Sequence, residues 1–263
     1  MSQILDDFKI DLSRLRRVLE LAEAVNSLAP VLHSTDDLPD SDFKAKLIGF
    51  REASLSSRAE MPILNGVLLL YLAGRFENFV RQVLEDLIDA VASDRKEFGE
   101  LPKAMKENLV IYTAEIMQNP RKYGHAENGV TAFVGILSEN LGGSLKNGVN
   151  SKCLSITLEN MRPEVLSDIF NRIGATKIWE RVGQQSQVQV HFGENNSERV
   201  TKKAKTKLNE FMDLRNKIAH PSGEMTWPGI DVAKDYIDFC EVLSCAIDGI
   251  CQVWTTTLGK EPG

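Results

Sequence analysis

The stretch SERVTKKAKTKLNEFMDLRNKIAHP occupies residues 197–221. Its apolar residues recur at intervals of three, four and seven: Val200, Ala204, Leu208, Phe211 and Ile218. This spacing places them on one face and predicts an amphipathic α-helix. Because a proline disfavours the helical conformation of the residue before it, we expect the helix to end at His220-Pro221.

Further helices are predicted on both sides of this stretch. Residues 63–91 contain no proline, and Pro62 fits the first turn of a helix there. A last helix begins near Asp231 and keeps an apolar face as far as Trp254. Other helices are expected at residues 4–25, 105–117, 130–141 and 163–173. The sequence therefore predicts an all-α helical bundle.

Two segments are predicted to be irregular. Residues 33–42 are acidic and lack periodicity, so they are expected to form a solvated loop. Val188, Val190 and Phe192 alternate with polar residues, but three pairs are too few to define a strand. We interpret this alternation as an extended loop.

Composition restricts the classes of function. The 263 residues are 43% hydrophobic and 26% charged, as in globular proteins. The net charge of −6 argues against binding nucleic acid over the whole surface, so any such site must be local. The four cysteines, Cys153, Cys240, Cys245 and Cys251, include no CxxC pair, and a reducing compartment is expected.

The N-terminus does not resemble a secretory signal. It reads MSQILDDF, with acids where a signal peptide carries basic residues. The longest apolar run, Val67 to Ala73, is too short to cross a bilayer. We expect a soluble, cytoplasmic protein without a membrane partner.

Arg215 interrupts the apolar face of the 197–219 helix. At about 100° per residue from Leu208, Ile218 falls at about 280° and Arg215 at about 340°. An unpaired buried guanidinium costs several kcal/mol, so Arg215 must pair with an acid or line a cleft for an anion. His220 would point about 140° away from Arg215 in a continuous helix, but leaving the helix allows its imidazole to turn toward Arg215.

Glu77 interrupts the stripe of the 63–91 helix in a similar way. From Phe76 it lies at about 100°, between Leu84 at about 80° and Ile88 at about 120°. One interpretation is an i,i+4 ion pair with Arg81. Another is that Glu77 reaches the cleft of Arg215 and orients it through a charge-assisted hydrogen bond. The two roles are compatible.

These residues carry a family resemblance. The segment Leu214-Arg215-Asn216-Lys217-Ile218-Ala219-His220 resembles the R-x4-6-H signature of the HEPN superfamily, with the usual polar residue after the arginine. Residues 70–80 resemble the aromatic-Glu-aromatic helix of its RiboL-PSP-like prokaryotic branch, and residues 162–174 are similar to its middle. Pro221 departs from the pattern, because many relatives have glycine there.

The resemblance implies a fold and an activity. It suggests one HEPN-like domain over residues 1–263, with a core at about 60–93 and 196–255 and a helical elaboration at about 95–195. Catalytic members are metal-independent endoribonucleases that act as homodimers. By that resemblance Arg215 would clamp the phosphate, His220 would act as general acid/base, Asn216 would position the substrate and Glu77 would support Arg215.

The biological setting also follows only from the resemblance. It suggests a toxin-like or phage-defence effector that cleaves RNA and is held silent by an antitoxin or regulatory protein. The alternative is a non-catalytic HEPN module that dimerises and binds a nucleotide or a partner, with Arg215 and Glu77 forming a structural pair.

A basic segment precedes the motif. Arg199, Lys202, Lys203, Lys205 and Lys207 fall within nine residues. They form either a solvated helix face or an RNA-binding surface, for which Lys202, Lys203, Lys205 and Lys207 are the candidates.

No cofactor or metal site is expected. His33, His125 and His191 have no acid or cysteine at ligand spacing. Cys240 and Cys251 share a helix face but lie about 16 Å apart along it, so we expect both in the core.

Overall fold

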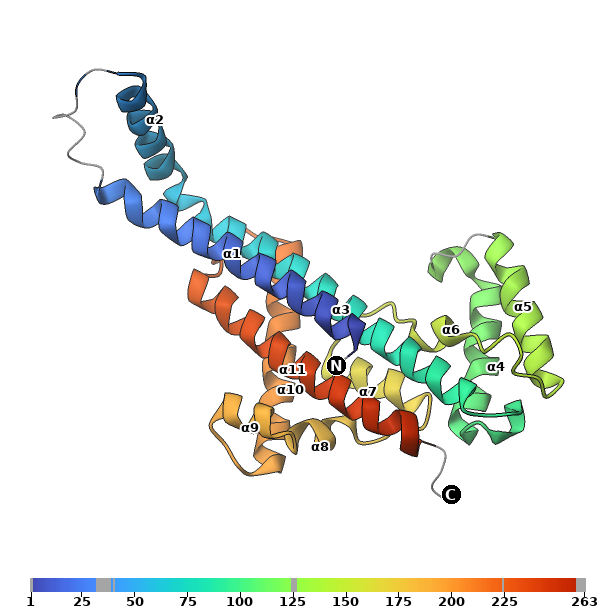
Figure 1. The fold of residues 1–263 in the computed structure, drawn as a ribbon. Coiled ribbons are helices and arrows are strands. Elements are labelled where there is room, and N and C mark those ends of the chain that lie inside the picture. The colour runs from blue at the N-terminus through green and yellow to red at the C-terminus, as the bar shows by residue number, and fades with distance from the viewer. Residues whose placement is uncertain (1, 32–38, 40, 124–126, 224, 259–263) are drawn as a thin grey trace. The chain divides into compact units, whose positions relative to one another are not determined.

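The all-α prediction is confirmed. The structure is a computed structural model that describes residues 2–31, 39, 41–123, 127–223 and 225–258. Over these ranges the chain forms eleven α-helices and no strand (Figure 1).

The helices follow one another in the order shown in Figure 1. Their bounds are α1 Gln3–Val31, α2 Asp42–Ser56, α3 Met61–Ser93, α4 Lys103–Gln118, α5 Glu127–Leu141, α6 Ser151–Ser155, α7 Pro163–Asn171, α8 Ile178–Gly183, α9 Ser186–Phe192, α10 Ser197–Ala219 and α11 Ile230–Thr257. Three 3-10 turns, Ser57–Ala59, Phe98–Glu100 and Pro120–Tyr123, lie between them.

The backbone contacts divide the chain into two compact units. The first unit comprises residues 1–6, 76–212 and 242–263, and the second comprises residues 7–75 and 213–241. Because α1, α3, α10 and α11 contain the boundaries, each of these helices contributes residues to both units.

Ion pairs hold the helices of the second unit together. On α1, Arg16 pairs with Asp238 of α11 at 2.7 Å. Asp11, also on α1, is buried and accepts a hydrogen bond from Nε of Arg75 on α3 at 2.6 Å. Since the Asp11 carboxylate is withdrawn from water, losing its cation would leave a buried charge uncompensated. These pairs fix the positions of α3 and α11 relative to α1 within the unit.

The first unit contains the shorter helices α4 to α9 together with parts of the long helices. The helix α4 contacts α5 and α6, while α8 contacts both α7 and α9. Buried aromatic residues fill its core, among them Phe170 and Trp179. The Trp179 indole donates to the carbonyl oxygen of Pro163 at 2.9 Å, so this buried polar group is satisfied.

A close approach joins α8 to α10 in the first unit. A Cβ at Gly183 would collide with Oγ1 of Thr201 and the carbonyl oxygen of Ser197. The Thr201 hydroxyl donates to the carbonyl oxygen of Trp179 at 3.1 Å. Only a glycine permits the end of α8 to lie this close to the first turns of α10.

The long helices agree with the sequence prediction and one short element does not. The observed α3, α10 and α11 begin and end within three residues of the predicted positions. The extended loop predicted for residues 188–192 is wrong, because Ser186–Phe192 form the helix α9. On this helix Val188 is 1% exposed while Val190 is 80% exposed, so the two valines face opposite sides.

Other differences concern the segments between the long helices. The helix α2 was not predicted, and most of the loop expected at residues 33–42 lies outside the described residues. Cys240 and Cys251 are buried as predicted.

One described helix, α3, is long and apolar enough by length and composition to cross a membrane. Core helices meet the same criterion, and the side chains of Leu72, Phe76 and Val80 are buried within the protein.

Candidate functional site

The end of α10 carries the predicted catalytic residues Arg215, Asn216 and His220. The helix ends at Ala219, and the His220 N–H still donates to the carbonyl oxygen of Asn216 at 3.0 Å. Pro221 has no N–H with which to continue this series. The predicted helix end is therefore confirmed, and His220 stands just beyond it with an exposed side chain.

Arg215 is half-buried on α10 and is not engaged in a salt bridge with any described residue. Its Nη1 donates to Oδ1 of Asn216 at 3.1 Å. A guanidinium has five N–H donors, so most of the donors of Arg215 can still bind an anion. The Asn216 amide holds one arm of the guanidinium in a fixed direction.

The loop that follows His220 is anchored to α3 inside the second unit. Asn65 is 5% exposed, and its side-chain amide donates to the carbonyl oxygen of Pro228 at 3.1 Å. Next to it, Gly66 faces the indole of Trp227, whose Cε3 lies 2.7 Å from where a Cβ would stand. These contacts fix the far end of the loop that begins at His220.

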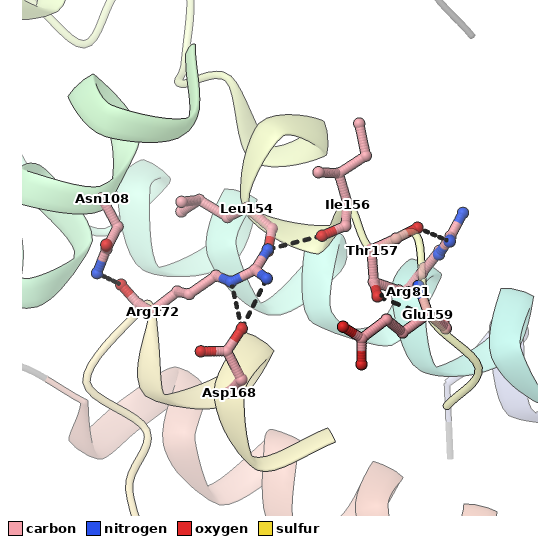
Figure 2. A network of polar contacts seen from close by, with 8 residues as sticks. All are labelled: Arg81, Asn108, Leu154, Ile156, Thr157, Glu159, Asp168 and Arg172. Carbon is pink, nitrogen blue, oxygen red and sulfur yellow. Dashed lines mark hydrogen bonds and ion pairs between the residues drawn. The ribbon is translucent and has the colours of Figure 1, made fainter. Parts of the chain in front are cut away.

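Glu77 forms the i,i+4 pair that its spacing predicts. Its Oε1 lies 2.6 Å from Nη2 of Arg81. The same Nη2 donates to the carbonyl oxygen of Thr157 at 2.8 Å, a contact that Figure 2 shows. The pair is confirmed within the first unit, and the support of Arg215 by Glu77 stays a prediction.

A second arginine, Arg172, lies in a polar network that sequence reasoning missed (Figure 2). Its Nε and Nη2 donate to Asp168 at 3.0 and 2.7 Å. Its Nη1 donates to the carbonyl oxygens of Leu154 and Ile156 at 3.0 and 2.7 Å. Only the Asp168–Arg172 spacing was readable from the sequence, because the two carbonyl groups belong to a distant segment.

Arg172 is not a candidate phosphate ligand. Its guanidinium is occupied by the chain and lies 4.1 Å from the centre of the Tyr112 ring. A pocket of about 430 Å³ lies beside it, and its lining includes four acidic residues, Glu115, Glu159, Glu164 and Asp168, against one lysine, Lys122. These negative charges disfavour an RNA backbone, so we interpret Arg172 as structural.

The predicted RNA-binding lysines separate into two groups. Lys202, Lys203 and Lys207 line a pocket of about 310 Å³ together with Phe192, Thr206 and Glu210. Lys205 belongs to the same helix but does not line this pocket. The structure thus brings three of the four lysines to one concave surface.

Within the ranges given above, no three His, Cys, Asp or Glu side chains are grouped as a metal ion would need. His33 and His125 lie outside the described residues.

Comparison with known proteins supports the family. The model of the RiboL-PSP-HEPN family matches residues 41–252, which include α10 and the motif at its end. This match confirms the resemblance to the HEPN superfamily and its RiboL-PSP-like branch. The searches of curated proteins and of solved structures returned no significant match.

The contact between Gly66 and Trp227 generates a prediction. Gly66→Ala should destabilise the protein by about 1–3 kcal/mol, because the added methyl group overlaps the indole. Gly74→Ala is the matched control on the same helix, since a Cβ there meets nothing within 4 Å. Replacing an exposed helical glycine by alanine should stabilise the protein by roughly 0.5–1 kcal/mol.

Urea unfolding followed by tryptophan fluorescence measures both variants. Equal effects of the two substitutions would contradict the packing of Trp227 on Gly66.

Proposed function

Because the chain belongs to the RiboL-PSP-HEPN family, we propose that it is a metal-independent endoribonuclease that cleaves RNA with Arg215 and His220. HEPN domains are often ribonucleases, and family membership supports an activity of this kind. The assignment to these two residues rests on one observation: Arg215 donates to Asn216 and has no ion pair with a described residue, while His220 is exposed just beyond the helix.

The chemistry suits these residue types. In the reaction, the ribose 2′-oxygen attacks phosphorus and the bond from phosphorus to the 5′-oxygen breaks, which leaves a 2′,3′-cyclic phosphate and a 5′-hydroxyl. An imidazole accepts the proton of the 2′-hydroxyl, and another delivers a proton to the departing 5′-oxygen. Both steps need only side chains, because the nucleophile is supplied by the substrate.

Arg215 serves as the phosphate clamp in this proposal. Its planar fork donates two parallel hydrogen bonds to a phosphate and stabilises charge that develops on the equatorial oxygens. Asn216 acts as a positioning residue, since its Oδ1 accepts from Nη1 of Arg215. Glu77 would orient Arg215 further.

A homodimer would complete the site. Two copies placed with their motifs facing one cleft supply one histidine as base and the other as acid. We propose that the protein acts in the cytoplasm as a toxin-like or phage-defence effector, restrained by an antitoxin or regulatory protein.

Cleavage in the presence of EDTA tests the assignment of Arg215 and His220. Wild-type protein should cut single-stranded RNA, whereas His220→Ala and Arg215→Ala should each lower the rate by at least about 100-fold. Arg215→Lys should remain impaired, because an ammonium group lacks the bidentate fork. Gel analysis and mass spectrometry of the product ends measure both rate and chemistry.

Lys217→Gln is the matched control for these substitutions. It removes a cation from the exposed side of the same helical turn and should retain most of the activity. Cleavage that survives both alanine substitutions would end the assignment.

Expression in a bacterial host separates the nuclease from the non-catalytic module. If the protein degrades cellular RNA, its induction should slow growth, and His220→Ala should restore growth at an equal protein level. A wild-type protein that leaves growth and RNA intact, or a defect that His220→Ala retains, favours the binding module.

The role of Glu77 is tested by comparison with its partner. Glu77→Gln and Arg81→Gln both remove the observed ion pair, which is worth about 0.3–0.5 kcal/mol for a helix pair of this spacing, and Arg81→Gln also removes the hydrogen bond to the carbonyl oxygen of Thr157. If Glu77 supports Arg215, Glu77→Gln should lower kcat well below that of Arg81→Gln although it removes fewer contacts, and Glu77→Asp should recover part of it. Equal kcat values for the two glutamine variants would show that Glu77 only pairs with Arg81 and does not support Arg215.

A further inference from the structure

The pocket between α9 and α10, lined by Phe192, Lys202, Lys203, Thr206, Lys207 and Glu210, is here called the Phe192 pocket. All of its residues belong to the first unit, and its volume of about 310 Å³ is near the lower end of the range for ligand sites. It combines one aromatic ring, three ammonium groups, a hydroxyl and a single carboxylate.

The pocket is locally basic on an acidic protein. Lys202 and Lys203 are exposed, and the three lysines outnumber Glu210, although the whole chain has a net charge of −6. The local field also acts on Glu194 at the α9–α10 turn, whose pKa is lowered by the backbone N–H of Asn196 and further by Arg199 and Lys203. The lysines therefore favour an anion at this part of the surface.

The backbone fixes the aromatic ring relative to the lysines. Phe192 is the last residue of α9, and Gly193 follows it with φ of 57°, a left-handed conformation that glycine adopts without strain. Lys203 Nζ donates to the carbonyl oxygen of Phe192 at 3.4 Å. The Gln189 amide donates to the carbonyl oxygen of Gly183 at 3.1 Å, which ties α9 to the end of α8.

The α8–α10 contact at Gly183 completes this support. Because α8 lies against the first turns of α10 there, the short helix α9 is held beside the lysine face. The pocket is thus built before any ligand arrives, which lowers the entropic cost of binding.

We propose that this pocket, in which a half-buried aromatic ring lies beside three lysines, is an anchoring subsite for one unpaired nucleotide of single-stranded RNA. The base stacks on Phe192, and the flanking phosphates lie against Lys202, Lys203 and Lys207. The Glu210 carboxylate repels phosphate and accepts hydrogen bonds from base N–H groups or a ribose hydroxyl. This subsite rests on the proposed function, because it supplies the substrate for the cleavage residues.

The subsite favours a single strand over a duplex. A base can lie flat on Phe192 only when it is not paired and stacked within a helix. Phosphate contacts alone would bind both forms, so the aromatic ring makes the distinction. Binding of phosphates by the lysines should weaken as the salt concentration rises, because it releases counterions. Stacking of the base on Phe192 should depend little on salt.

Binding to the cleavage-impaired His220→Ala protein tests the subsite. The probes are a fluorescein-labelled single-stranded RNA of about 12 nucleotides, the same strand with one 2-aminopurine, and its duplex. Adding Phe192→Leu should weaken single-strand binding by about 5- to 30-fold and remove the quenching of 2-aminopurine, because leucine keeps the apolar volume but has no aromatic face. Phe192→Tyr should retain both signals.

The lysines are tested with a matched control on the same helix. Lys203→Gln should weaken binding and lower the slope of log affinity against log salt by about 0.7. Lys205→Gln makes the same change of charge outside the pocket and should have less than half the effect. Circular dichroism checks that each variant remains helical.

The outcomes separate this proposal from the cleavage assignment. Binding that depends on Phe192, with no cleavage by wild type, supports the subsite and overturns the proposed function. Cleavage with unchanged binding by Phe192→Leu, equal effects of Lys203→Gln and Lys205→Gln, or equal affinity for duplex and single strand overturns the subsite.

Discussion

The candidate site depends on one constraint, the missing N–H of Pro221. The last helical hydrogen bond of α10 is donated by His220, and the next residue has nothing to donate. The chain must therefore leave the helix one residue after Ala219, which presents the imidazole at the surface instead of along the helix. Arg215 and Asn216 remain inside the helix, where the regular backbone fixes their directions. An exposed imidazole and a half-buried guanidinium thus lie at one helix end.

The long helices were readable from the sequence because each buries a continuous apolar stripe. Trp254, with which the predicted apolar face of the last helix ends, is 3% exposed. The short helix α9 was misinterpreted for a physical reason. Val188 and Phe192 are four residues apart and share one helix side, whereas Val190 between them faces solvent, so a helix with few turns produced the pattern of a strand.

The residues of the candidate site were proposed from the sequence, whereas the contacts that support them were not. Arg215 was proposed because an unpaired cation on an apolar helix face is costly to bury. The i,i+4 spacing of Glu77 and Arg81 predicted the ion pair that the structure contains. The anchoring of the loop by Asn65 and the indole of Trp227 could not be read in this way, since more than 150 residues separate the partners along the chain. The sequence also did not show that Lys205 lies outside the pocket that the other three lysines line, because the pocket depends on the position of α9.

The network around Arg172 has a consequence for how the protein responds to its ionic surroundings. Two of the acceptors of this buried guanidinium are backbone carbonyl groups, which are dipoles rather than ions. Dissolved ions screen exposed charges far more than such buried contacts. A rise in salt concentration should therefore weaken the RNA binding proposed for the lysine-lined surface more than it weakens the carbonyl contacts of Arg172.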